Sequence, residues 1–146
     1  MNDCNYWMTD KGVPRVSEMG FKANLHEIFQ RGFCVARAKR IVMLTNHISG
    51  KTEKLPYTET TYQLSNERYN QLIREVVEEW DEKVLMIDIE KAYMEYFDTF
   101  AGNRRKEIER LLLPDLVHLS EQGHEFYFDA FIKDFEPIVE AVMKMA

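Results

Sequence analysis

The stretch Val84-Leu85-Met86-Ile87-Asp88 is a short apolar run that ends in an aspartate, and Ile41-Val42-Met43-Leu44 is a second run of the same kind. Neither run shows the polar alternation of a half-exposed strand, so both predict strands buried on both faces, as in a parallel sheet. The clearest helical stripe lies between them and consists of Tyr69, Leu72, Ile73, Val76, Val77 and Trp80. Strands that alternate with amphipathic helices predict an α/β layered fold.

Outward from the two strands, apolar spacing predicts helices at residues 21–32, 65–80, 89–113 and from 120 onward. Ser65 is the expected N-cap of the second helix, Gly102-Asn103 interrupts the third, and Pro137 is expected to bend the last. The remaining stretches are polar and without periodicity, and they are predicted to be loops at residues 1–19 and 45–63.

The predicted sheet is too small for its helices. Two parallel strands do not form a self-sufficient sheet, and helices on both faces need more strands to cover. Residues 1–146 are therefore expected to be part of a domain, with further strands located before Met1 or supplied by a partner.

Composition excludes several classes of protein. The chain has 19 basic and 25 acidic residues, a net charge of -6, which argues against a nucleic-acid-binding surface. It has no apolar stretch of the roughly 20 residues that a membrane span requires, and its first residues do not resemble a signal peptide. The two cysteines fit neither a disulfide framework nor a metal or redox spacing. We therefore expect a soluble cytoplasmic protein without cofactor or metal, although an upstream signal peptide would change its location.

The chemistry is expected in the loop before the last helix, where Asp115 precedes His118 by three residues. An aspartate at this spacing can accept the Nδ1 proton of the histidine and leave Nε2 as a general base. The same pair also occurs by chance as a turn aspartate beside a surface histidine. Read alone, the residues leave both interpretations open.

The segment around this pair resembles the last signature block of the SGNH (GDSL-type) ester hydrolases, in which Asp-x-x-His leads into a helix with a glycine about five residues on. Asp115, His118 and Gly123 match that pattern. Met1-Asn2-Asp3 is similar to the end of the family's Gly-x-Asn-Asp block, with Met1 at the variable position. Segments between these blocks resemble the family in the same order, at Phe21–Leu25, Ile41–Thr45, Tyr69-Asn70 and Val84–Asp88.

The resemblance implies a three-layer α/β/α, flavodoxin-like hydrolase fold, of which residues 1–146 would form the C-terminal half. It implies that a serine attacks an ester carbonyl while His118 accepts its proton. Asp115 would orient the imidazole, and the side-chain amide of Asn2 would donate to the oxyanion. The implied substrate is a small-molecule ester, and the implied fold includes N-terminal strands that this chain lacks.

The chain departs from the family at the nucleophile. The family serine lies in a Gly-Asp-Ser block, and no Gly-Asp-Ser occurs in residues 1–146. The chain alone is therefore expected to be inactive, and an N-terminal fragment or an oligomer partner would have to complete it. The alternative is a non-catalytic remnant or an interaction module that complements a separate fragment. Nucleotide binding at Ser49-Gly50-Lys51-Thr52 is a weaker hypothesis, because the glycine that a P-loop requires is replaced by Thr45.

Overall fold

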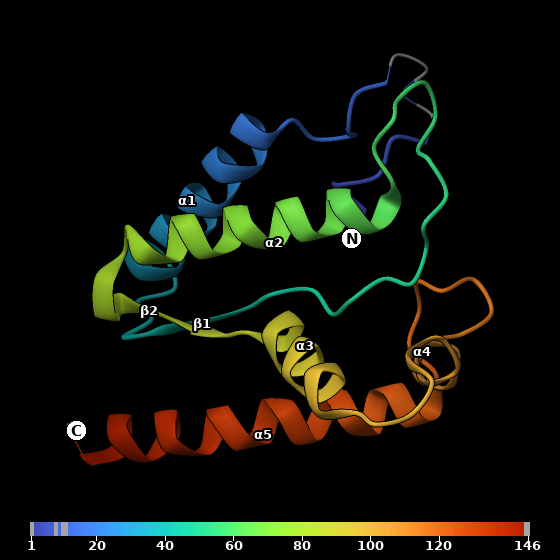
Figure 1. The fold of residues 1–146 in the computed structure, drawn as a ribbon. Helices are drawn as coiled ribbons and strands as arrows, with labels where there is room; N and C mark the ends of the chain where they lie inside the picture. Colours follow the sequence, from blue (N-terminus) through green and yellow to red (C-terminus); the bar gives the residue numbers. More distant parts are fainter. Residues whose placement is uncertain (1, 8, 10–11, 145–146) are drawn as a thin grey trace.

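The computed structural model describes residues 2–7, 9 and 12–144. Five α-helices, a single 3₁₀ turn and two strands form the described part of the chain (Figure 1). In chain order they are α1 (Glu18–Cys34), β1 (Ile41–Leu44), α2 (Tyr62–Glu78), η1 (Asp81–Lys83), β2 (Val84–Ile87), α3 (Ile89–Thr99), α4 (Arg104–Leu111) and α5 (Glu121–Lys144).

The two predicted strands pair with each other in parallel, in a register that runs from Ile41 opposite Val84 to Leu44 opposite Ile87. The α/β class and both strand positions are therefore confirmed. The prediction of burial on both faces is wrong for β1, whose four side chains are only half-buried, whereas Val84 and Ile87 of β2 are buried. Both strands are edge strands within the described residues, and the difference arises because α2 and α5 pack more extensively on β2 than on β1.

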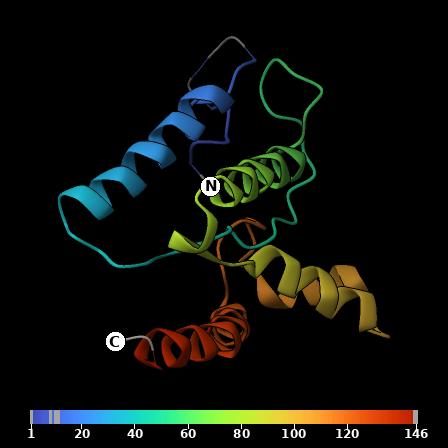
Figure 2. The same ribbon diagram turned by 90° about the vertical axis from the view of Figure 1, so that its left-hand side faces the viewer.

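Helices lie on both faces of this small sheet (Figures 1 and 2). One apolar core joins α1 and α2 to the sheet and contains Leu25, Phe29, Ile73, Val76, Val77 and Val84. The core on the opposite face lies towards α3, α4 and α5 and contains Ile48, Ile87, Ile89, Tyr93, Phe97 and Leu111. The chain thus has α/β/α layering around two strands.

The helix ends follow from their capping residues. Asn103 accepts a hydrogen bond from the backbone N–H of Lys106 and begins α4 at the predicted interruption. The prediction of Ser65 as a cap is wrong, because α2 begins one turn earlier, where Thr61 accepts from Leu64 N at 3.1 Å. Ser65 lies inside the first turn of α2 and donates instead to the carbonyl of Cys4.

The last helix, α5, has the fewest buried residues of the five α-helices. It continues through Pro137, and Gly123 is its only buried residue among those described. Its apolar stripe, which packs towards the α3 face of the sheet, is only half-buried and includes Tyr127, Phe131, Phe135 and Ile138.

Gly123 fixes the position of α5 against α4. A Cβ on Gly123 would lie 1.9 Å from the carbonyl oxygen of Leu111, a backbone atom that cannot rotate away. We expect Gly123→Ala to lower the free energy of unfolding by about 2–3 kcal/mol, as overpacking of a fixed contact does. Urea denaturation measures the change.

Gly20 provides a matched control for this substitution. Each of the two glycines lies in the first turn of its helix and donates its N–H to a serine three residues earlier, Ser17 or Ser120, at 3.1 Å. A Cβ on Gly20 meets only the Ser17 hydroxyl at 3.1 Å and a methyl group of Val16 at 3.5 Å. Gly20→Ala is expected to be neutral or slightly stabilising, and an equal loss in both variants would contradict the proposed clash.

Candidate functional site

The loop that carries Asp115 and His118 is closed by backbone hydrogen bonds at its base. Leu113 N donates to His118 O at 2.7 Å, and Ser120 N donates to Leu111 O at 3.0 Å. Leu116, at the tip, adopts a φ of 57°, an uncommon left-handed conformation for a side chain of its size. The loop is thus a tight, defined turn that leads into α5.

One carboxylate holds both the backbone and the ring of His118. Oδ1 of Asp115 accepts from the backbone N–H groups of Val117 and His118, each at 3.0 Å. Oδ2 of Asp115 lies 2.6 Å from Nδ1 of His118. These hydrogen bonds from His118 and Val117 hold the pKa of Asp115 far below its usual range. The contact that the sequence predicts between the two side chains is therefore present.

This geometry sets the chemical capacity of the histidine. A proton on Nδ1 directed at an ionised carboxylate leaves Nε2 unprotonated in the neutral ring, which is the state of a general base. The His118 side chain is 74% exposed and that of Asp115 is 46% exposed. The pair is accordingly open to a reactant, and the described residues do not enclose it.

The described residues bring no predicted nucleophile or oxyanion donor to this pair. Asn2 is exposed, and no hydrogen bond within the described part of the chain joins it to Asp115 or His118. Its role as oxyanion donor stays a prediction. The four serines serve the backbone: Ser17 and Ser120 cap helices, Ser65 bonds to Cys4 O, and Ser49 donates to Leu116 O.

The loop after β1 supports the turn from the other side. Gly50 N donates to Leu116 O at 2.9 Å, and Ser49 Oγ donates to the same oxygen at 3.1 Å. A Cβ on Gly50 would lie 2.6 Å from Ile108 and 3.4 Å from Leu116, so this segment packs directly on the turn. Ser49-Gly50 therefore positions Leu116, one residue beyond Asp115.

His47, on the same loop, is half-buried. Its Nδ1 is 2.7 Å from Ile48 O, and its ring lies 6.3 Å from that of Tyr93. The pKa of His47 is lowered to about 4, mainly by burial and to a smaller extent by repulsion from His118 and His124. His47 is therefore a neutral histidine near the turn, with the Nδ1 proton directed at a backbone carbonyl.

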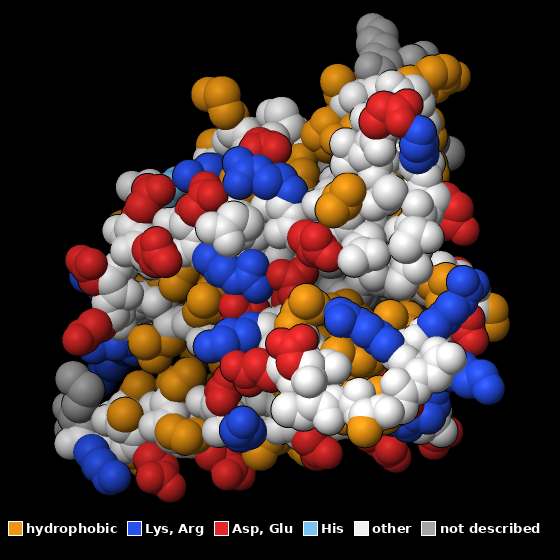
Figure 3. Space-filling view, in the orientation of Figure 1, with side chains coloured by type: hydrophobic (Ala, Val, Ile, Leu, Met, Phe, Trp, Pro, Cys, Tyr) orange, Lys and Arg blue, Asp and Glu red, His pale blue; other side chains and the backbone are white. Residues whose placement is uncertain are grey.

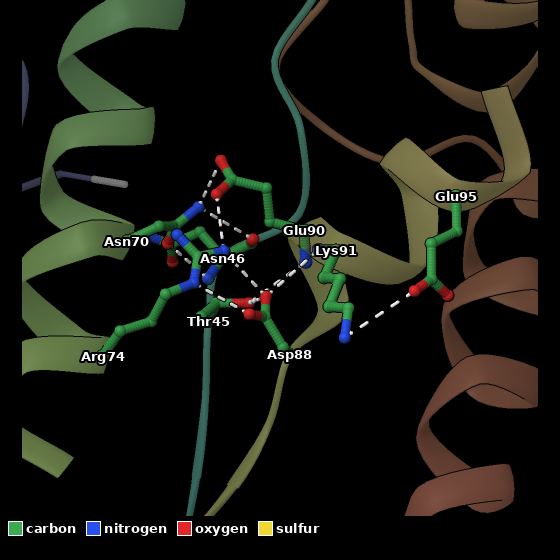
Figure 4. Close-up of polar contacts among 8 residues, drawn as sticks. All are labelled: Thr45, Asn46, Asn70, Arg74, Asp88, Glu90, Lys91 and Glu95. Atoms are coloured by element: carbon green, nitrogen blue, oxygen red, sulfur yellow. Dashed lines mark hydrogen bonds and ion pairs between the residues drawn. The ribbon is translucent and has the colours of Figure 1, made fainter. Parts of the chain in front are cut away.

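A second polar cluster lies where β1 and β2 end (Figure 4). Arg74 of α2 donates to both oxygens of Asp88 and to Oε2 of Glu90, all at 2.8 Å. Thr45 donates to Asp88 Oδ1 and accepts from Glu90 N, each at 3.0 Å. Asn70 donates to Glu90 Oε1 at 2.7 Å. This network ties α2 to the carboxyl ends of both strands, the position at which parallel α/β sheets commonly bind ligands.

The two carboxylates of the network differ in their ionisation. Burial opposes the charge of Asp88, but hydrogen bonds from Arg74, Lys91 N and Thr45 outweigh it and hold its pKa below the usual range. Burial raises the pKa of Glu90 in spite of its bonds from Asn70 and Arg74. Sequence reasoning noted the strand-end Asp88 but missed Arg74 and Glu90, because nothing local marks either of them as a partner of Asp88.

The remaining classes of site can be addressed for the described residues. No group of three His, Cys, Asp or Glu side chains within residues 2–7, 9 and 12–144 could hold a metal ion. Of the helices in this part of the chain, none combines the length and apolar composition of a membrane span. Comparison with models of known families, with curated proteins and with solved structures finds no match to this chain.

Proposed function

We propose that this chain supplies the acid–base half of an ester hydrolase of the SGNH type. The observation that carries the proposal is the 2.6 Å contact between Asp115 Oδ2 and His118 Nδ1 on a loop rigidified by the same carboxylate. His118 accepts a proton from an attacking serine, and Asp115 stabilises the imidazolium that forms. The substrate is a small-molecule ester.

The nucleophile comes from a Gly-Asp-Ser segment outside residues 1–146. The proposal is supported by the use that the chain makes of its own serines, since each of their hydroxyls serves a helix cap or a backbone carbonyl. The exposure of His118 is what a histidine requires if its serine belongs to another segment. The α/β/α layering around two parallel strands is compatible with a larger flavodoxin-like sheet, in which Asn2 would donate to the oxyanion.

The test is to express the chain as a fusion with the in-frame codons that precede Met1 in its gene. The fusion is expected to hydrolyse p-nitrophenyl acetate and to be labelled by a fluorophosphonate on a serine of the added segment. Residues 1–146 alone should show neither property. Upstream codons without a Gly-Asp-Ser block, or a folded fusion that resists labelling, would refute the proposal.

A further inference from the structure

The outer edge of β1 is open. Thr45 N donates to Ile87 O, and in a parallel pair alternate residues face the partner strand, so Met43 also faces β2. Val42 and Leu44 therefore direct their backbone N–H and C=O groups away from β2. Within the described residues no strand pairs with this edge.

The two outer edges of the sheet are protected differently. A hollow of about 770 Å³ lies beside β2, and its charged lining residues are Asp88, Lys91, Glu95, Asp129, Lys133 and Asp134. Figure 3 views the molecule from this side and shows acidic and basic side chains across it. Such charges are the usual defence of an edge strand against association. Neither strand contains a charged residue or a proline, so the contrast lies in the neighbouring side chains, of which only Asp3 is charged in the hollow beside β1.

Apolar surface borders the open edge. Figure 2 shows α1 above and to the side of the strands, where β1 has no neighbouring strand. A hollow of about 290 Å³ lies there between α1, α2 and β1, and Asp3 is the one charged residue among those that line it. Ile28 of α1 lines the same hollow and is 59% exposed. Val42 and Leu44 are half-buried on the opposite face of the strand. An apolar, uncharged edge of this kind is a site of strand pairing.

We infer that β1 pairs with β1 of a second copy of this chain, which forms a four-stranded sheet. A two-fold axis makes this pairing antiparallel. With the axis at Met43, Val42 faces the partner's Leu44, and the two residues exchange both backbone hydrogen bonds. By the two-fold symmetry, Leu44 and the partner's Val42 exchange the same two backbone hydrogen bonds. This inference concerns residues 1–146 as a molecule, and in the fusion that tests the proposed hydrolase the strands of the added segment would occupy the same edge in place of the second copy.

Charge favours a second copy over an unrelated strand. Lys39 and Arg40 directly precede β1, and Asp3 lines the same hollow as Asn46, which lies just beyond the other end of the strand. In the antiparallel register Arg40 lies opposite the partner's Asn46. The basic pair of each copy therefore reaches the end of the strand at which the partner's Asp3 lies, and the symmetry forms this contact twice.

The mass of the protein in solution and the register of the two paired β1 strands test the inference. Residues 1–146 should have twice their 17.4 kDa in light scattering. In a Cys34→Ser background, Met43→Cys should form a disulfide-linked dimer on mild oxidation, because directly opposed residues of this kind have Cα atoms about 4.5 Å apart. Val42→Cys is the control, since its two copies would be separated by roughly 8 Å, too far for a disulfide. A monomer, or equal cross-linking of both variants, would overturn the inference.

Charge-reversal variants distinguish loss of the dimer contact from loss of folding. Lys39→Glu with Arg40→Glu should weaken dimerisation about tenfold, and adding Asp3→Lys should restore it. Arg105→Glu with Lys106→Glu changes the net charge equally at the start of α4 and should leave the dimer intact. Rescue by Asp3→Lys supports the antiparallel register, whereas weakening without rescue, or equal weakening by the control pair, contradicts it.

Discussion

Arg74→Met is expected to destabilise the protein by about 3 kcal/mol. The substitution removes the cation that two poorly exposed carboxylates share, since the side chains of Asp88 and Glu90 are only 15% and 8% exposed. Loss of one member of a buried ion pair leaves an uncompensated charge, which costs about 3–5 kcal/mol in proteins. Arg74 itself is 22% exposed, so we place the effect at the lower end of this range. Urea denaturation at a fixed protein concentration measures it.

Arg68→Met is the matched control, because Arg68 lies on the same helix and also contacts two carboxylates, those of Glu18 and Glu75. Its side chain is 44% exposed, and exposed ion pairs contribute at most about 1 kcal/mol. If Arg68→Met and Arg74→Met lowered the free energy of unfolding by similar amounts, the network of Figure 4 would stabilise the protein no more than an exposed ion pair does.

The effect of Arg74→Met should also depend on pH. The folded-state pKa of Asp88 lies below its ordinary value of 3.8, so the stabilisation from its pairing with Arg74 is present above that value and is lost as the pH falls through the folded pKa. Burial raises the pKa of Glu90 above 4.5, so Glu90 takes up a proton early as the pH falls. The variant should therefore lose less stability near pH 5 than near pH 8. An equal loss at both values would contradict an electrostatic origin.

The features that the sequence could predict are those determined by residues close together in the chain. The strands were predictable because a continuous apolar run is a local signal, and the Asp115–His118 contact was predictable because the two residues lie three apart in one turn. The start of α2 was missed because Thr61 and Ser65 are equally suitable caps, and the choice depends on Cys4, which is 61 residues away from Ser65 and engages its hydroxyl.

Contacts between residues far apart in the sequence could not be predicted from local sequence patterns. His26 accepts a hydrogen bond from Trp80, 54 residues away, and pairs with Glu79. Arg74 and Glu90 each follow an ordinary helical pattern, and only the packing of α2 over the strand ends brings them together. The burial of His47 under the same packing was likewise outside the reach of local patterns.

In the fusion that tests the hydrolase proposal, His118→Ala should lower kcat/KM for p-nitrophenyl acetate by about 10⁴-fold or more, because the serine loses its base. Asp115→Asn should cost a similar factor, since an amide at this position can no longer hold the Nδ1 proton in place as a carboxylate does. The pKa of Asp115 lies far below its usual range, so this carboxyl should add no separate acid limb to the pH profile of kcat/KM. His124→Ala, six residues along the chain, is the control and should change kcat/KM less than tenfold. If His118→Ala also stays within tenfold, with fluorophosphonate labelling intact, His118 is a surface residue and the base lies elsewhere.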